Sequence, residues 1–85
     1  MIKMTKKRNY LEISADLLRV AKEGARKSHL VYKANLNFSI IETYLKRLQE
    51  TGLITVPSDD HLFKTTLKGE EYLNQYMKLT DIFTV

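Results

Sequence analysis

Residues 28–52 read SHLVYKANLNFSIIETYLKRLQETG, and this stretch decides the predicted fold. It contains two helical patterns separated by a short polar turn. The first, about His29–Ala34, follows Ser28, whose hydroxyl suits the N-cap position. Asn35 then tolerates the left-handed conformation that ends a helix, and Asn37 can cap the next one. Two helices joined by so short a turn predict a helix-turn-helix.

The second helix of this stretch is amphipathic. Its apolar positions are spaced three, four and three residues apart, at Phe38, Ile41, Leu45 and Leu48. Gly52 ends the helix, and Leu53 is placed to pack back on Leu48 as in a Schellman motif. The opposite face carries the polar residues Ser39, Thr43, Lys46 and Arg47. A helix with such a face suits the major groove of DNA, which is about 12 Å wide.

The sequence before this stretch predicts a basic arm and a first helix. Residues 1–8 lack apolar periodicity and are expected to form a flexible arm. Asn9 can cap a helix of about Tyr10–Glu23, which Gly24 ends. Residues 25–27 are too few for a helix and could pair as a very short strand.

The sequence after residue 52 predicts a β-hairpin. Leu53–Pro57 and Leu62–Thr66 are β-branched or aromatic runs, and residues 58–61 between them have turn composition. A hairpin that follows a helix-turn-helix is the wing of a winged helix. The predicted class is therefore α+β, a winged helix-turn-helix with a three-helix core, a β-hairpin wing and a C-terminal fourth helix.

The fourth helix follows the hairpin. Thr66 can cap it, Gly69 permits a close backbone approach in its first turn, and it ends near Leu79. Residues 9–80 then form one winged-helix domain. Residues 81–85 form an apolar C-terminal tail.

The chain is basic, and its positive charge is concentrated in the first half. The net charge is +4, with +7 on residues 1–47 and −3 on residues 48–85. A basic half on so small a protein favours an anionic partner, of which nucleic acid is the most common. There is no cysteine and no apolar run of membrane-spanning length, which predicts a cytoplasmic protein without disulfides.

Nothing in the sequence predicts catalysis. His29 and His61 lie far apart without metal-ligand spacing, and the glycines lie at the ends of predicted elements rather than in a phosphate loop. We therefore expect no enzyme activity, no metal and no cofactor.

Basic and hydroxyl side chains around the helix-turn-helix are the candidate DNA contacts, because such groups bind phosphates and base edges. The predicted set is Lys27, Ser28, Lys33, Asn37, Ser39, Thr43, Lys46, Arg47, His61 and Lys64. Glu42 borders this set, and we expect it to pair with Lys46 four residues on. The tip of the wing is acidic, so the hairpin would contact DNA through His61 or Lys64 or not at all.

Four parts of the chain resemble the small archaeal winged-helix proteins of the ArnR-like kind, which include chromatin-associated 10a-type DNA binders. These parts are Tyr10–Leu18, Ala21–Asn37, Tyr44–Ile54 and Lys64–Leu73. The resemblance implies a sequence-tolerant or promoter-specific DNA binder. Its DNA face would fall on Lys27, Ser28, Lys33, Asn37, Ser39, Thr43 and Lys46.

The resemblance also implies a dimer through the last helix. A helix that ends near Leu79 is shorter than the long coiled coil of the 10a type, and the acidic wing is a second departure. A homodimer would then be held by apolar residues of the last helix and the tail, which are Tyr72, Tyr76, Leu79, Ile82 and Phe83.

The sequence therefore predicts a nucleoid-associated protein that binds double-stranded DNA. It would act as a transcriptional regulator or a small chromatin-type protein, with the helix of about Phe38–Thr51 in the major groove. The alternative is a winged-helix module that binds another protein and no DNA, because a fold alone does not fix function.

Overall fold

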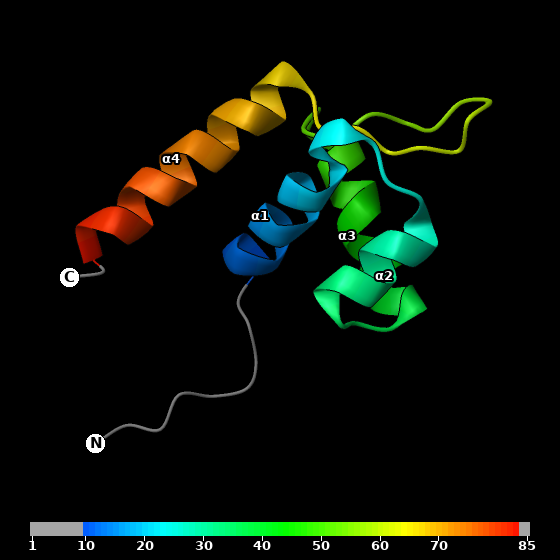
Figure 1. The fold of residues 1–85 in the computed structure, drawn as a ribbon, viewed down its shortest axis with the longest axis horizontal. Coiled ribbons are helices and arrows are strands. Elements are labelled where there is room, and N and C mark those ends of the chain that lie inside the picture. Colours follow the sequence, from blue (N-terminus) through cyan, green and yellow to red (C-terminus); the bar gives the residue numbers. More distant parts are fainter. Residues whose placement is uncertain (1–9, 84–85) are drawn as a thin grey trace.

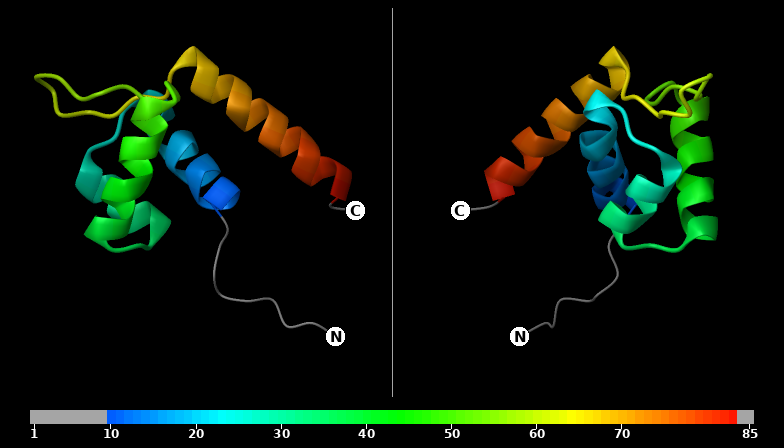
Figure 2. Two further views of the ribbon diagram at one scale, coloured as in Figure 1. Left: turned by 180° about the vertical axis from the view of Figure 1, so that it is seen from behind. Right: turned by 45° about the vertical axis from the view of Figure 1, so that its right-hand side comes forward.

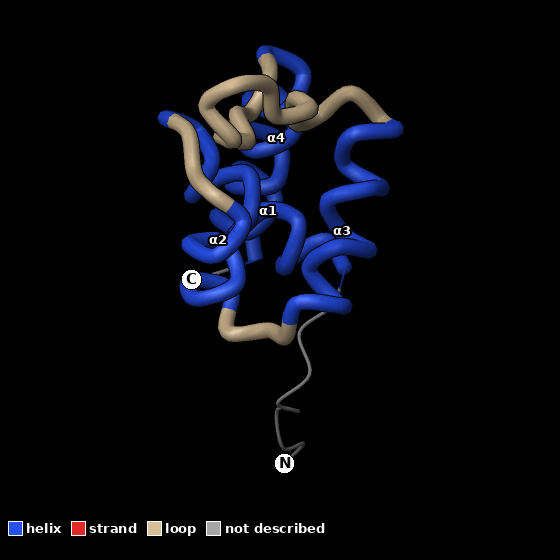
Figure 3. Tube along the Cα trace, turned by 90° about the vertical axis from the view of Figure 1, so that its right-hand side faces the viewer, coloured by secondary structure: helices blue, strands red, loops and turns tan. Residues whose placement is uncertain are grey.

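The computed structural model describes residues 10–83, which fold into four α-helices and one long loop (Figure 1). The helices are α1 (Tyr10–Val20), α2 (Lys27–Ala34), α3 (Phe38–Glu50) and α4 (Leu67–Phe83), and the 3₁₀ turn η1 (Ala21–Glu23) continues α1. α1 lies in the middle, with α2 on one side and α4 on the other. α2 also contacts α3, to which a short turn joins it (Figure 3). The predicted order of helices is confirmed.

One apolar core joins α1, α2 and α3. Its largest fully buried side chains include Leu17, Leu18, Leu30, Ile41 and Leu48. The predicted stripe of α3 is buried from Ile41 onward, whereas Phe38 at its start is 52% exposed. Phe38 lies in the first turn of α3, so the 3-4-3 spacing places it at the end of the stripe, beyond the core.

The ends of the helices around the turn are capped as the sequence predicts. Asn35 is left-handed, with φ 58°, and ends α2. The Asn37 side chain accepts a hydrogen bond from the Ile40 N–H at 2.9 Å and caps α3. At the other end of α3, Gly52 has φ 78°, and the Leu53 N–H donates to the Leu48 carbonyl at 2.9 Å. This bond and the one from the Gly52 N–H to the Gln49 carbonyl form the predicted Schellman motif.

The start of α2 differs from the prediction by two residues. The helix begins at Lys27, and its N-cap is Arg26, which makes no side-chain capping bond. Ser28 lies inside the first turn. Ala25 alone makes the short antiparallel bridge expected of residues 25–27, through paired backbone bonds with Phe63 of 3.0 and 2.8 Å. This bridge fixes the backbone at Ala25, so Arg26 takes the N-cap position and the helix begins at Lys27.

Residues 53–66 form a long loop, and the two strands of the predicted β-hairpin are not confirmed. Among residues 10–83 there is no named strand, only isolated bridges between Ala25 and Phe63 and between Ile54 and Thr65. The loop runs out and back beside the end of α3 (Figures 1 and 2). The Lys64 N–H donates to the Thr55 hydroxyl at 3.0 Å, so a side chain takes a backbone donor that a strand pair would use. The strands predicted at Leu53–Pro57 and Leu62–Thr66 are therefore not confirmed, although the arms pair at the antiparallel bridge of Ile54 with Thr65 and through the Thr55 N–H, which donates to the Lys64 carbonyl at 2.8 Å.

α4 begins as predicted and ends later. The Thr66 hydroxyl accepts from the Gly69 N–H at 3.0 Å, which is the expected N-cap. Gly69 is buried against the loop, and a Cβ at this position would lie 2.3 Å from the Leu53 carbonyl oxygen. The helix then continues through residues 81–83, which the sequence assigns to a tail. No glycine or proline follows Leu79 to stop it.

Candidate nucleic-acid interface

The outer face of α3 is polar and open. Ile41, Leu45 and Leu48 are at most 3% exposed and point into the core. The predicted contacts Ser39, Thr43, Lys46 and Arg47 are all exposed on the other sides of the helix. Because the apolar side of α3 is fixed against the core, its polar side faces solvent, where a partner can bind.

Two predicted contacts on this helix are already used in local hydrogen bonds. The Asn37 side-chain oxygen caps α3, so this residue orders the first turn of the helix. The Thr43 hydroxyl donates to the Ser39 carbonyl at 3.2 Å, which leaves the lone pairs of its oxygen to accept from outside. Ser39 and Thr43 therefore lie on one line along the helix, one turn apart.

Arg47 lies toward α1 and not on the middle of the outer face. Its guanidinium carbon lies 5.6 Å from the centre of the Tyr10 ring, and that ring stacks on Tyr44 at 5.1 Å between centres. These residues and Thr43 line a hollow of about 170 Å³. Tyr10 lies at this seam between α1 and α3 and is 41% exposed.

Lys27 and Glu42 form an ion pair between α2 and α3. The Lys27 ammonium lies 2.8 Å from the Glu42 carboxylate and 5.9 Å from the centre of the Phe38 ring. The expected pairing of Glu42 with Lys46 is replaced by this contact. Sequence spacing could not identify it, since the partners are 15 residues apart and lie on different helices.

The other predicted contacts on α2 are open to solvent. Ser28 and Lys33 are both exposed, and each lies on a different turn of the helix. Tyr32 lies between them in sequence and is 79% exposed. Tyr32 is a surface residue beside the predicted contacts that the sequence prediction did not include. Its neighbours Leu30 and Ala34, both buried, give the helical phase that could have found it.

The structure brings His61 close to the start of α2. A hollow of about 350 Å³ lies between α2 and the 53–66 loop, and its lining residues are Arg26, Lys27, Ser28, Pro57, His61 and Phe63. His61 has a left-handed backbone with φ 59° and is exposed. Lys64 is exposed on the returning arm of the loop, and its aliphatic stem lies near Gly24. Of the two loop residues predicted as contacts, only His61 joins the lining of this hollow.

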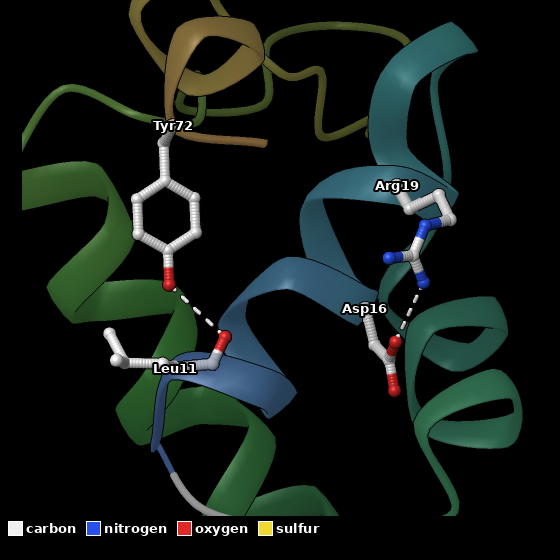
Figure 4. Close-up of polar contacts among 4 residues, drawn as sticks. All are labelled: Leu11, Asp16, Arg19 and Tyr72. Carbon is white, nitrogen blue, oxygen red and sulfur yellow. Dashed lines mark hydrogen bonds and ion pairs between the residues drawn. The ribbon is translucent and has the colours of Figure 1, made fainter. Parts of the chain in front are cut away.

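The predicted dimer residues divide into two groups. Tyr72 and Tyr76 pack against the core of their own chain, and the Tyr72 hydroxyl donates to the Leu11 carbonyl at 3.1 Å (Figure 4). Burial is the main cause that raises the pKa of the Tyr72 hydroxyl. Leu79 is 55% exposed, and Ile82 and Phe83 belong to the last turn of α4.

Residues 10–83 hold neither a metal-binding cluster nor a membrane-spanning helix. No group of three or more His, Asp or Glu side chains there could hold a metal ion. No helix in the same range is long and apolar enough to cross a membrane.

Comparison with known proteins identifies the family. The structure of Sso10a-2, a DNA-binding protein from Sulfolobus solfataricus, aligns with a TM-score of 0.78 and 23% identity over 88% of this chain and 81% of that one. The structure of ZitR from Lactococcus lactis aligns with a TM-score of 0.61 and 22% identity over 96% of this chain and 65% of that one. No curated protein matches the sequence. A family model described as winged helix-turn-helix matches residues 7–83, and the chain belongs to the winged helix-turn-helix family.

Proposed function

We propose that this protein binds double-stranded DNA, with the outer face of α3 in the major groove. The observation that carries the proposal is the open polar face of α3, where Ser39, Thr43 and Lys46 are exposed opposite a buried apolar stripe. The similarity to the DNA-binding protein Sso10a-2 supports it. The role that fits is a non-enzymatic transcriptional regulator or small chromatin-type protein, associated with the nucleoid in the cytoplasm.

The proposed contacts have different tasks. Ser39 and Thr43 are short enough to reach base edges near the start of α3, whereas Lys46 lies further along and meets a phosphate. Ser28, Lys33 and Arg47 hold the flanking backbone. Asn37 contributes by capping α3, and Lys27, His61 and Lys64 lie at the edge toward the 53–66 loop.

Binding is expected to weaken steeply with salt. If about five phosphates are neutralised, the logarithm of the binding constant should fall with the logarithm of the salt concentration at a slope of about −4 to −5. Fluorescence anisotropy of a labelled random duplex at several salt concentrations measures this slope. Single-stranded DNA and RNA of the same length serve as competitors. Absence of duplex binding at about 50 mM salt would overturn the proposal, and capture of one stoichiometric protein partner would then favour the adaptor role.

Two substitutions on α3 separate phosphate contacts from base contacts. Lys46→Ala should weaken binding to all sequences alike and reduce the salt slope by about 1, whereas Thr43→Ala should alter the preference among sequences. Lys78→Ala is the matched control, since Lys78 is exposed on α4 and lies far from α3 in the sequence. A binding-site selection with each variant measures preference, and identical effects of Lys46→Ala and Lys78→Ala would count against the assignment.

We also propose that two copies pair through the C-terminal half of α4. Toward its C-terminus the helix stands away from α1 (Figure 2), and Met77 and Leu79 are 48% and 55% exposed. Apolar side chains on an unpacked helix gain most from a second apolar surface. Because Tyr72 and Tyr76 pack against the core of their own chain, the pairing would depend on Leu79 and the following turn with Ile82 and Phe83.

The pairing predicts a concentration-dependent mass. Leu79→Glu should raise the dissociation constant of the dimer by about tenfold or more, because a charge buried at an apolar contact costs at least 1.4 kcal/mol. Leu67→Glu is the control, since Leu67 is 81% exposed at the opposite end of α4. Sedimentation velocity over a range of concentrations measures the effect. A wild-type mass that stays monomeric throughout would contradict the proposal.

A further inference from the structure

Lys27 lies at the seam between the hollow beside the 53–66 loop and the α3 helix. It is the first residue of α2 and lines the hollow together with Arg26, Ser28 and His61. Its ammonium is nevertheless directed to α3, where it donates to the Glu42 carboxylate at 2.8 Å. One cation on the proposed DNA-binding side is therefore already paired with an anion of its own chain.

The ion pair is open to solvent and to an incoming ligand. The Lys27 side chain is 35% exposed and the Glu42 side chain is 59% exposed. Such surface pairs contribute little to folding and exchange readily with other ions. A phosphate that reaches this seam meets a lysine that can bind it and a carboxylate that repels it.

We infer that Glu42 competes with DNA phosphate for the Lys27 ammonium and so limits the affinity of the protein for duplexes of any sequence. The inference rests on the proposed DNA binding. A carboxylate and a phosphate oxygen make the same charge-assisted hydrogen bond to an ammonium, so one can replace the other at Lys27. While Lys27 is paired with Glu42, DNA binding releases no counterion at Lys27. When Lys27 is not paired, its ammonium can neutralise one more phosphate.

This arrangement favours discrimination between sequences. A phosphate contact strengthens binding to all duplexes equally, so withholding one lowers non-specific affinity without altering the base contacts of α3. Ser39 and Thr43 then determine a larger share of the difference between sequences. Glu42 is thus a specificity residue that acts through Lys27, and not a base contact itself.

The test is a double-substitution cycle on random duplex DNA at about 100 mM salt. Glu42→Gln should raise the affinity by about fivefold and make the salt slope steeper by about 1. Lys27→Gln alone should weaken binding by about twofold, because it leaves the Glu42 carboxylate unpaired, and should leave the salt slope unchanged, because the paired Lys27 releases no counterion. Adding Lys27→Gln to Glu42→Gln should remove both the gain in affinity and the change in slope.

Glu50→Gln is the matched control. Glu50 is exposed on the same helix, its substitution removes the same charge, and the structure gives it no ion pair among residues 10–83. It should raise the affinity by less than about twofold and leave the salt slope unchanged, since no cation is released. Thermal unfolding of each variant checks that the fold is intact.

Three results would overturn the inference while DNA binding itself stands. Glu42→Gln could match Glu50→Gln, or its gain could persist when Lys27 is also replaced, and either result would reduce the effect to general charge. A gain or loss confined to one sequence would instead make Glu42 a base contact. Absence of duplex binding by every variant, including the wild type, would overturn the proposed function and the inference with it.

Discussion

Replacing Gly69 with alanine is expected to lower the free energy of unfolding by about 2–3 kcal/mol. A Cβ at Gly69 would lie 2.3 Å from the Leu53 carbonyl oxygen and 2.6 Å from the Thr65 methyl carbon. The carbonyl cannot move aside freely, because the Thr66 N–H donates to it at 3.0 Å. The added methyl would therefore push α4 away from the base of the 53–66 loop.

The sign of this effect is diagnostic. At an open helix position, replacing glycine with alanine stabilises a protein by up to about 1 kcal/mol, because alanine loses less backbone entropy. A close backbone contact, as at Gly69, reverses the sign. Gln75→Ala, at an exposed position of the same helix, should change the stability by less than about 0.5 kcal/mol. Urea denaturation followed by circular dichroism compares the variants, and a Gly69→Ala protein as stable as the wild type would disprove the close approach.

Leu48→Ala should lower the free energy of unfolding by about 3 kcal/mol or more. Leu48 is 1% exposed on the buried face of α3, and its carbonyl accepts from the N–H groups of both Leu53 and Ile54. The substitution leaves a cavity under α3 and removes the apolar contact that accompanies the Schellman motif. Because a domain of this length is stable by only about 5–10 kcal/mol, the loss is a large fraction of the total.

The control is a leucine that is exposed to solvent instead of buried in the core. Leu67→Ala removes the same atoms from a side chain that is 81% exposed, so it should cost less than about 0.5 kcal/mol. Thermal and urea unfolding of both variants give the difference. Equal losses for Leu48→Ala and Leu67→Ala would show that α3 is not seated on the core as the structure places it.

Features that depend on neighbouring residues were predictable from the sequence. The left-handed end at Asn35, the cap at Asn37, the Schellman motif at Gly52 and the cap at Thr66 each follow from bonds within a few residues. The amphipathic spacing of α3 likewise identified its buried and exposed faces. The N-cap assigned to Asn9 and the basic arm of residues 1–8 lie outside the described residues.

Features that depend on distant residues were not predictable in this way. α2 begins at Lys27 and not after Ser28 because Phe63, far along the chain, fixes Ala25 by backbone bonds. The composition of the two arms of the hairpin suits strands, but the Thr55 hydroxyl accepts from the Lys64 N–H, a backbone donor that a regular strand pair would use. Short β-branched runs cannot show which donor a side chain will occupy.

In the candidate site, too, local features were predictable from the sequence and contacts between helices were not. Helical phase alone placed Ser39, Thr43 and Lys46 on the open face of α3. The partner of Glu42 and the stacking of Arg47 over Tyr10 arise between helices, so they required the packing of α3 against α1 and α2. The sequence thus identified which residues are available to a ligand and not which of them are already paired.

The 53–66 loop is fixed at its base and free at its tip. Bridges at Ile54 and Phe63 hold the base, while residues 58–61 are all exposed. Since the entropy of closing a loop rises by only about 0.6 kcal/mol for each doubling of its length, residues can be inserted at this tip with little effect on the core. The chain has no cysteine, so Ser58→Cys creates a unique thiol there. A fluorophore on that thiol would report how closely the loop approaches a bound duplex, without touching α3.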